Sequence, residues 1–235
     1  MKVVDERLSI SIIGGKGKFG TMIADKIREG NEFIIDELID VGDNLLKAKD
    51  TDVYVDVTNA KAFSENFHSY NMFSGPLVMA TTGLSPEQIE DVKYLAKNRP
   101  VIMSGNFSIT MYNFIETVKE AAKRANSTTN VTIIEYHHIT KKDKPSGTAK
   151  MIKEAIISAR PDLFNEDNVD VLSVRGGTIS GIHEVVFANK DDEVIKLSHE
   201  AGSRKPFATG LLEVCKWIAY QPNGFYTMDD FMKSR

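Results

Sequence analysis

The segment 135–149 carries the side chains of this chain that are best suited to acid–base chemistry. Two adjacent imidazoles, His137 and His138, are followed by three lysines, the first of which is Lys141. Histidine changes charge near neutral pH, and lysine donates protons or fixes anions. The segment therefore brings proton donors and positive charge into one stretch of chain, as a reaction on a small anion requires.

A Pro-Ser-Gly-Thr turn follows these residues and predicts the start of a helix. The N–H groups in the first turn of a helix lack partners within the helix and bind negative charge. We therefore expect a small anionic substrate to lie against Gly147 and Thr148, with Lys141 supplying positive charge beside them. Asp143 and Pro145 are expected to fix the loop, Pro145 through its restricted backbone angle.

Two other interpretations of the paired histidines stay open. They could act as hydrogen-bonded polar groups in a core, or they could bind a metal ion. A metal site is disfavoured because neighbouring residues at a strand end point to opposite faces of a sheet. No cysteine nearby and no His-Glu-x-x-His spacing completes such a site. We therefore predict that no metal is bound.

A glycine-rich turn at 14–20 is the second pattern with a chemical meaning. It contains G-x-G-x-x-G from Gly15 and G-x-x-G-x-x-G from Gly14. Between a first strand and a first helix, such a turn lets the backbone approach a pyrophosphate, whose charge is held at the helix start. The alternative is a plain strand-to-helix turn. An acidic residue about twenty positions further on should meet the adenosine ribose. Asp40 is the best candidate, and Asp36 is the runner-up.

Strands and helices alternate over the first hundred residues, which predicts a parallel sheet with helical crossovers. Apolar runs predict strands, and helical spacing or capping residues predict helices. The strands are expected at 8–13, 33–39, 53–57, 77–80 and 101–103, and the helices at 19–28 and 85–98. After residue 106 the predicted helices are 111–125, 146–160 and 207–220, and the predicted strands are 131–136, 171–174, 184–188 and 194–198. The strands of this second half alternate more and have fewer intervening helices, which favours an antiparallel or mixed sheet.

These elements predict an α/β chain with two domains. A Rossmann-like dinucleotide-binding domain with a parallel sheet is expected from residues 1–108 and 208–235. An inserted α+β domain with a mixed sheet is expected from residues 109–207, and we assign substrate binding and oligomerisation to it. The helix predicted at 207–220 returns the chain to the first domain.

The composition is that of an ordinary globular protein, with 235 residues, 42% hydrophobic, 26% charged and a net charge of −4. A negative net charge gives no reason to expect nucleic-acid binding, which usually requires a basic surface. No apolar run approaches the roughly 20 residues of a membrane span. The N-terminus lacks the features of a signal peptide. Cys215, the single cysteine, excludes an intrachain disulfide and is expected to be a core thiol. Together these features predict a cytoplasmic protein.

The segment 135–149 resembles the active-site loop of the dihydrodipicolinate reductase family. The family pattern is E-x-H-H, a lysine three residues later, then D-x-P-S-G-T-A, and the segment matches it nearly residue for residue. Stretches 80–83 and 104–108 resemble family turns that touch the dinucleotide, and 173–184 resembles the family's R-G-G-x-x-G-x-H run. This chain departs from the family pattern at Ala80, Gly105, Ile139 and Thr140.

The resemblance implies an activity and the residues that perform it. A hydride would pass from a reduced nicotinamide to an unsaturated cyclic dicarboxylate, and a proton to the neighbouring carbon. This is the reduction of 4-hydroxy-tetrahydrodipicolinate in diaminopimelate and lysine biosynthesis. The resemblance names His137 and Lys141 as the proton-donating pair, and His138, Gly147 and Thr148 as substrate contacts. Together with the glycine turn, the resemblance implies that NADH or NADPH is bound by these residues: Gly14, Gly15, Lys16, Gly17, Lys18, Phe19, Asp40, Ala80, Thr81, Thr82, Ser104, Gly105, Asn106 and Phe107.

The resemblance also implies a homotetramer built through the sheet of the second domain. Taken alone, the 173–184 run indicates a glycine-rich connection, in which Arg175 could help to neutralise a carboxylate and His183 could support the sheet. Two competing functions are another two-domain NAD(P)-dependent oxidoreductase, such as an amino-acid dehydrogenase, and a non-catalytic dinucleotide sensor. The 135–149 loop argues against the first, and its proton donors argue against the second.

The preferred cofactor depends on the charges near the predicted ribose site. A carboxylate such as Asp40 accepts hydrogen bonds from the ribose hydroxyls of NADH and repels the 2′-phosphate of NADPH. Val41 and Gly42 offer no cation, but Lys16 and Lys18 could turn toward that phosphate. A partly exposed charge contact is worth about 1 kcal/mol or less. We therefore expect both cofactors to be used, with NADH favoured by less than about tenfold.

Overall fold

The computed structural model describes residues 7–40, 43, 45 and 50–235, and this part of the chain divides into two compact units. Unit 1 holds the described residues up to Ser108 together with Phe207–Arg235, and unit 2 holds Ile109–Pro206. Residues 1–6, which bear on the expected lack of a signal peptide, and residues 41–42, which bear on cofactor preference, lie outside the described residues.

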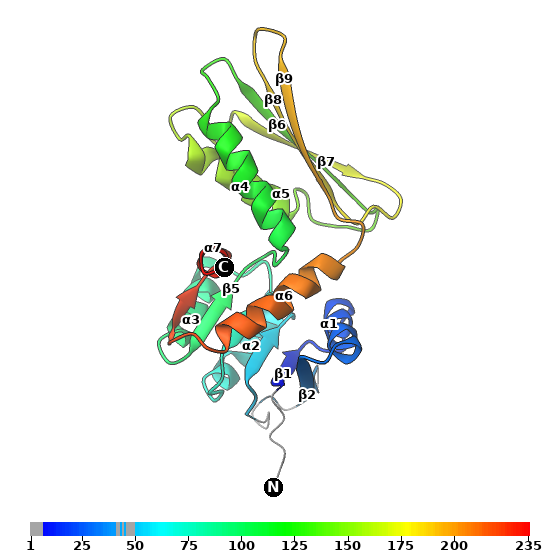
Figure 1. Cartoon of the computed structure of the whole chain (residues 1–235), viewed down its shortest axis with the longest axis vertical. Helices are drawn as coiled ribbons and strands as arrows, with labels where there is room; N and C mark the ends of the chain where they lie inside the picture. Colours follow the sequence, from blue (N-terminus) through cyan, green and yellow to red (C-terminus); the bar gives the residue numbers. More distant parts are fainter. Residues whose placement is uncertain (1–6, 41–42, 44, 46–49) are drawn as a thin grey trace. The chain divides into compact units, whose positions relative to one another are not determined.

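Unit 1 is built on a parallel sheet that has six strands among the described residues (Figure 1). In spatial order they are β10 (Gly224–Tyr226), β5 (Pro100–Met103), β4 (Leu77–Met79), β3 (Val53–Asp56), β1 (Leu8–Ile13) and β2 (Phe33–Ile39). β3 is buried along its whole length, which explains why it is apolar up to its last residue. The strand order changes direction at β1, which has β2 on one side and β3 on the other. In such sheets, ligands bind beyond the carboxyl ends of the strands at that point.

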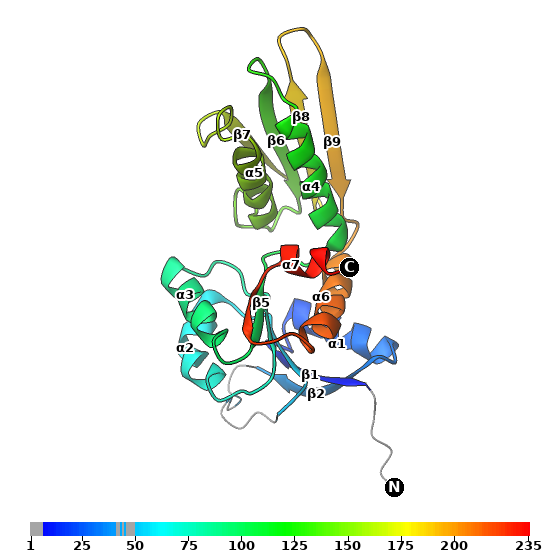
Figure 2. The same cartoon turned by 60° about the vertical axis from the view of Figure 1, so that its left-hand side comes forward.

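Helices cover both faces of this sheet. α2 (Ala60–Tyr70) and α3 (Pro86–Leu95) lie on one face, and α1 (Lys18–Glu29) and α6 (Lys205–Ile218) lie on the other (Figure 2). A short helix, α7 (Met228–Lys233), follows β10. Cys215 lies buried on α6, as predicted for a core thiol, and burial raises the pKa of its thiol. No helix in the described part of the chain is long and apolar enough to cross a membrane.

The elements predicted from the sequence omit α2, β10 and α7. α2 has a clear local cause, because the side chain of Asn59 accepts hydrogen bonds from the N–H groups of Lys61 and Ala62, each at 3.1 Å. Its apolar side chains Phe63 and Tyr70 are fully buried in the core. β10 has only three residues and pairs with β5 at the sheet edge, so it is too short to give a recognisable pattern.

The glycine turn between β1 and α1 has the tight geometry that its sequence predicts. Gly14 has a φ of 86°, which side chains rarely permit. Gly20 lies so close to the turn that a Cβ added to it would come 2.2 Å from the carbonyl oxygen of Gly14. The first turn of α1 therefore packs directly on the loop before it. Gly17, the N-cap residue, has no side chain to cap the N–H groups of α1.

Unit 2 consists of a mixed sheet, four-stranded over the described residues, with two helices on its inner face (Figures 1 and 2). The strand order is β7 (Val169–Arg175), β6 (Asn130–His137), β8 (Ile182–Ala188) and β9 (Val194–Glu200). β6 and β7 are parallel, and the other neighbours are antiparallel. α4 (Ile109–Lys123) and α5 (Gly147–Ala159) pack against each other and enclose a core with the sheet. The fold class predicted from the sequence, a parallel Rossmann-like sheet plus an inserted α+β region with a mixed sheet, is confirmed.

The outer face of the unit 2 sheet is covered by no described helix of that unit. Its apolar side chains include Ile134 and Tyr136 on β6 and Leu172 and Val174 on β7, which are cross-strand neighbours. Leu172 is 53% exposed and Val174 is 41% exposed. Exposed apolar side chains on neighbouring strands are typical of a surface that contacts another molecule.

Replacing Gly20 with alanine should destabilise the protein by about 1 to 3 kcal/mol or more, because the added methyl group meets backbone atoms and not a movable side chain. The measurement is chemical unfolding followed by circular dichroism. Gly30→Ala is the matched control at the other end of α1, where an added Cβ has ordinary contacts of 3.6 and 3.8 Å. Equal stability of the two variants would show that α1 does not depend on its close approach to the turn.

Candidate active site

His137 is the last residue of β6, and its side chain lies on the inner face of the sheet. The residue is only 8% exposed. Gly181 lies beside the ring, and a Cβ added there would come 3.2 Å from Nε2 of the imidazole. On another side the ring meets His183, with ring centroids 5.3 Å apart and an interplanar angle of 76°. The imidazole is therefore held between bare backbone and a second imidazole.

Glu135 is a fully buried carboxylate on the same face of β6. Its Oε1 accepts hydrogen bonds from the backbone N–H of Ser146 at 3.0 Å, Oγ of Ser173 at 2.6 Å and Nη2 of Arg175 at 2.8 Å. Its Oε2 lies 3.4 Å from Nδ1 of His137. Neither of these two atoms has a hydrogen-bond partner among the described residues. One oxygen is thus fully engaged, and the other faces the imidazole.

These contacts set the charges of the cluster. Burial would raise the pKa of Glu135, but the hydrogen bonds that Oε1 accepts outweigh it and hold the pKa at about 2. Burial lowers the pKa of His183 to about 4. Burial also lowers the pKa of His137, while the negative charge of Glu135 raises it. At neutral pH the resting cluster therefore holds one carboxylate and two mainly neutral imidazoles beside a guanidinium.

Glu135, His137 and His183 each present an atom that could bind a metal ion, and these atoms lie within 4.8 Å of one another. The surroundings do not suit a cation. Arg175 holds one carboxylate oxygen at 2.8 Å, and the positive charge of Lys141 also acts on His137. Two fixed positive charges oppose a divalent ion at this point. The arrangement suits a carboxylate that accepts a hydrogen bond from an imidazole N–H.

The loop after β6 is fastened to the glycine-rich connection between β7 and β8. The N–H of Gly176 donates to the carbonyl of His137 at 2.9 Å, and the N–H of Ile139 donates to the carbonyl of Gly177 at 3.2 Å. These bonds continue the pairing of β6 and β7 beyond the strand ends. The loop is therefore held by the 173–184 run that the sequence analysis singled out.

Arg175 joins the same loop to Glu135. Besides its bond to the carboxylate, Nη2 donates to the backbone carbonyl of Asp143 at 2.6 Å. The Arg175 side chain is only 4% exposed. The carboxylate that Arg175 neutralises is thus a buried residue of the protein itself.

Lys141 and His138 lie on this loop, and each has a partner within it. Nζ of Lys141 lies 2.8 Å from both carboxylate oxygens of Asp143. Nδ1 of His138 forms a hydrogen bond of 2.8 Å with Oγ1 of Thr140. The positive charge of Lys141 also lowers the pKa of His137. Asp143 therefore holds the ammonium group in place within electrostatic reach of His137.

α5 begins at the turn that the sequence predicts. Ser146 is its N-cap, and Oγ of Ser146 accepts a hydrogen bond from the N–H of Ala149 at 3.1 Å. Gly147 is exposed, and a Cβ added there would meet nothing within 4 Å, while Thr148 is half-buried. The first turn of α5 is therefore accessible to an anion. The residues predicted for unit 2, which are His137, His138, Lys141, Gly147 and Thr148, all lie on the single segment from the end of β6 to the start of α5.

Unit 1 holds a cavity of about 350 Å³ at the carboxyl ends of β1, β2 and β3. Its lining includes Gly14, Gly17, Asp40, Thr58 and Asn59. This is the position at which doubly wound sheets bind nucleotides. Of the other predicted residues in the glycine turn, Gly15 is buried, Lys16 and Lys18 are exposed and Phe19 is half-buried. The residues fit a dinucleotide, with an uncapped helix start for a pyrophosphate and a carboxylate for a ribose.

Asp40 directly follows β2, whereas Asp36 lies inside that strand. Oδ2 of Asp40 accepts a hydrogen bond of 2.8 Å from the backbone N–H of Lys16. The ammonium group of Lys16 lies 3.5 Å from Asp43, which also accepts a hydrogen bond of 2.8 Å from the N–H of Asp40. Of the two candidate acids, Asp40 is the one that lines the cavity.

Asp56 is a buried carboxylate that the sequence analysis missed. It ends β3, and its Oδ1 accepts hydrogen bonds from the N–H and Oγ1 of Thr58 at 2.8 and 2.7 Å and from Oγ1 of Thr81 at 2.8 Å. The hydroxyl of Tyr70 donates to its other oxygen. Asp56 thus joins the turn after β3 to the turn after β4. An acidic residue at the end of a buried parallel strand is the signal that could have identified it.

The remaining predicted cofactor residues form the turns after β4 and β5, at 80–82 and 104–107. The N–H of Ser104 donates to the carbonyl of Met79 at 3.2 Å, which joins the two strand ends. Ala80 is half-buried, Thr81 is buried, and Thr82 and Gly105 are exposed. Asn106 and Phe107 are only 6% and 3% exposed. These last two side chains are therefore packed beneath their turn and support its shape.

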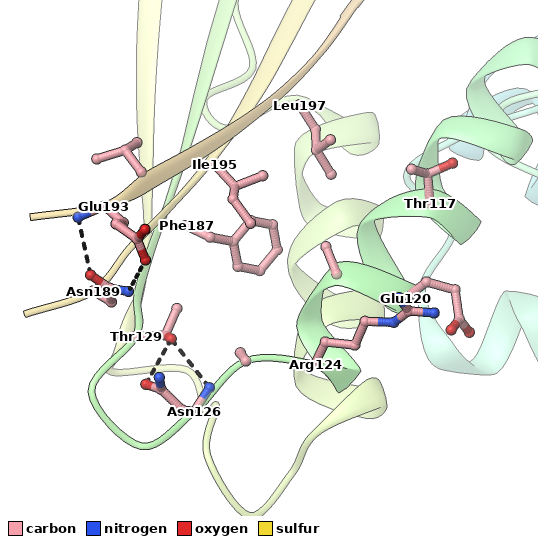
Figure 3. A pocket seen from close by; sticks show the side chains of 13 residues that line it. Thr117, Glu120, Arg124, Asn126, Thr129, Phe187, Asn189, Glu193, Ile195 and Leu197 are labelled. Carbon is pink, nitrogen blue, oxygen red and sulfur yellow. Dashed lines mark hydrogen bonds between the residues drawn. The ribbon is translucent and has the colours of Figure 1, made fainter. Parts of the chain in front are cut away.

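A further cavity, of about 790 Å³, lies in unit 2 (Figure 3). Phe187, Ile195 and Leu197 line it from the sheet, Glu120 lines it from α4, and Arg124 lines it from the turn directly after α4. It adjoins the start of β6, whereas His137 is at the end of this eight-residue strand, roughly 25 Å away along an extended backbone. Its described lining holds no imidazole, thiol or ammonium group. This cavity is therefore separate from the cluster around His137.

Two family models together match most of the chain. Residues 8–107 match the model described as dihydrodipicolinate reductase, N-terminus, and residues 110–232 match dihydrodipicolinate reductase, C-terminus. The 4-hydroxy-tetrahydrodipicolinate reductase of Caldanaerobacter subterraneus subsp. tengcongensis is 34% identical over 249 residues, covering 96% of this chain and 98% of that protein. The protein of the same name from Thermosipho africanus is 34% identical over 227 residues, with coverage of 96% and 98%.

Solved structures agree on the fold. Dipicolinate-bound dihydrodipicolinate reductase from Paenisporosarcina sp. TG-14 superposes with a TM-score of 0.73 at 21% identity, covering 94% of this chain and 97% of that chain. The family resemblance carried by the loop at 135–149 thus extends over both units. The chain belongs to the dihydrodipicolinate reductase family.

Proposed function

We propose that this chain reduces 4-hydroxy-tetrahydrodipicolinate to tetrahydrodipicolinate, with a reduced nicotinamide dinucleotide bound by unit 1 and the substrate bound by unit 2. As a member of its family, the chain is an oxidoreductase of diaminopimelate and lysine biosynthesis. The observation that supports this division of roles best is the segment from the end of β6 to the start of α5, in which His137 and Lys141 precede an accessible helix start.

The residues of unit 1 suit the cofactor, which when bound supplies the hydride. The turn at Gly14 and the uncapped start of α1 would hold the pyrophosphate. Asp40 would accept hydrogen bonds from the ribose hydroxyls. Thr81, which is held by Asp56, would set the position of the turn after β4.

The residues of unit 2 suit an anionic substrate that must be protonated. Gly147 and Thr148, at the start of α5, would bind a substrate carboxylate, with Lys141 supplying positive charge. His137 would donate its proton to the carbon next to the one that receives the hydride. Burial lowers the pKa of the resting imidazole, and the negative charge of a bound dicarboxylate would raise it again. The proton is thus loaded when the substrate arrives.

Two further properties belong to this proposal. We expect a homotetramer that buries the outer face of the unit 2 sheet, since Leu172 and Val174 are exposed there. We also expect the protein to work in the cytoplasm, in keeping with its single, buried cysteine.

Replacing His137 or Lys141 with alanine should lower turnover by about 100- to 10,000-fold, because each change removes a positioned proton donor. The affinity for the cofactor should hardly change, because neither residue belongs to unit 1. Turnover is followed by the absorbance of the reduced nicotinamide, with the coupled synthase product as substrate. Lys142→Ala, at an exposed neighbour, is the matched control. Near-wild-type turnover in both variants would make the catalytic assignment wrong.

Replacing Asp40 with alanine should shift cofactor preference toward NADPH, because the change removes a carboxylate that repels the 2′-phosphate. The wild type should favour NADH by less than about tenfold. The measurement is the ratio of the specificity constants for the two cofactors. Asp36→Ala should leave this ratio unmoved, because Asp36 lies within β2. The opposite pattern would transfer the role to Asp36.

Replacing Leu172 with lysine should dissociate the tetramer, because it places a charge in the apolar surface that the assembly would bury. Light scattering at micromolar concentration measures the mass. Met72→Lys is the control, since Met72 is also an exposed apolar residue, at 65% against 53% for Leu172, and belongs to unit 1. A monomeric wild-type protein would contradict the proposed assembly.

A further inference from the structure

Glu135 is the point at which the segments around His137 meet. Its Oε1 accepts hydrogen bonds from β7, through Ser173 and Arg175, and from the N-cap residue of α5, through the N–H of Ser146. Nε2 of His183, on β8, lies 3.9 Å from Oε2. The proposed reaction gives Glu135 no contact with substrate or cofactor, so a buried charge of this kind needs another reason.

The two oxygens of Glu135 have different surroundings. Oε1 has three hydrogen-bond donors, whereas Oε2 has none among the described residues and lies 3.4 Å from Nδ1 of His137. A buried carboxylate oxygen without a donor is costly, and so is a buried ring nitrogen without a partner. Both costs are removed when Nδ1 carries a proton and donates a hydrogen bond to Oε2. The geometry therefore favours one tautomer and one orientation of the ring.

We propose that Glu135 is a positioning residue for His137, which holds the ring through Nδ1–H and thereby makes Nε2 the nitrogen that delivers the proton. This inference rests on the proposed role of His137 as the proton donor. Oε1 serves the same purpose indirectly, because it anchors Arg175 and Ser146 and so keeps the carboxylate from turning. The negative charge of Glu135 also stabilises the imidazolium form that must exist before the proton is donated.

Other charged groups face His137 from each neighbouring element. Arg175 on β7 and Lys141 on the loop lower the pKa of His137, and Asp143 on the loop raises it. His183 on β8 is neutral near pH 7, because burial lowers its pKa to about 4. Burial has the largest effect and lowers the pKa of His137, and among the charges Glu135 has the largest effect and raises it. Removing the charge of Glu135 must therefore lower the pKa of His137.

The variant that tests this inference is Glu135→Gln, which keeps the size of the side chain and an oxygen that can accept from Ser146 and Ser173. NMR titration of the histidine rings in the substrate-free protein should show a lower pKa for His137, with the signal assigned by its loss in His137→Ala. Turnover should fall by about 10- to 100-fold with KM changed less than about threefold, and the limb of the pH profile that reports loss of the donor proton should move to lower pH. A purely structural role would leave the His137 pKa and the pH profile unmoved.

Glu184→Gln is the matched control. It makes the same change of charge on β8, but Glu184 lies on the outer face, where it accepts a hydrogen bond of 3.3 Å from the hydroxyl of Tyr136. It should leave the pKa of His137 and the turnover unchanged. An equal response in the two glutamine variants would overturn the inference.

A second variant covers the case in which Glu135→Gln fails to fold because Arg175 is left without its counter-charge. The double variant Glu135→Gln/Arg175→Gln removes both charges. It should still show a lowered His137 pKa and slow turnover, because Glu135 acts on His137 more strongly than Arg175 does. Wild-type turnover in the double variant would overturn the inference. Near-wild-type turnover in His137→Ala would instead overturn the proposed role of His137 as the proton donor, while the NMR result would still report whether Glu135 and His137 are coupled.

Discussion

The buried ion pair between Glu135 and Arg175 is the interaction on which the arrangement of unit 2 depends. Both side chains are almost fully enclosed, at 0% and 4% exposure. Removing one partner of such a pair typically costs about 3 to 5 kcal/mol, because the other charge stays buried without compensation. The pair joins the end of β6, the end of β7, the loop at Asp143 and the start of α5. The positions of the proposed proton donors and of the helix start proposed to bind an anion depend on this one contact.

Unit 1 uses a carboxylate in a similar place with different partners. Asp56 ends its strand as Glu135 nearly ends β6, and each gathers the turns that follow neighbouring strands. The donors to Asp56 are hydroxyl groups and a backbone N–H, and the donors to Glu135 include a guanidinium. Hydroxyl donors fix geometry without adding a positive charge, which suits a unit in which a carboxylate, Asp40, is proposed to bind the ribose. A guanidinium adds a positive charge, which suits the unit in which an anionic substrate is proposed to bind.

The sequence predicts much of this fold because its strongest signals are local. The strands 8–13 and 33–39 have the predicted bounds. As predicted, the glycine turn lies between a strand and a helix, and the 135–149 loop joins a strand to a helix start. α2 is absent from the predicted elements although its signals are present in the sequence, since Asn59 caps it and Phe63, Phe67 and Tyr70 recur at helical spacing. The Glu135–Arg175 pair could not be predicted, because its partners are 40 residues apart. Their contact exists only once β6 and β7 pair in parallel with Glu135 opposite Ser173.

The alternation of side chains along β6 limits which changes this strand can accept in evolution. Its side chains alternate, so that Ile134 and Tyr136 face outward while Glu135 and His137 face the helices. A slip of one residue would exchange the two sets, because a strand has a period of two. An insertion or deletion in β6 before Glu135 would therefore move the carboxylate and the imidazole together onto the apolar outer surface. Substitutions on either face must preserve the same register, so the chemistry and the outer surface are constrained to evolve together.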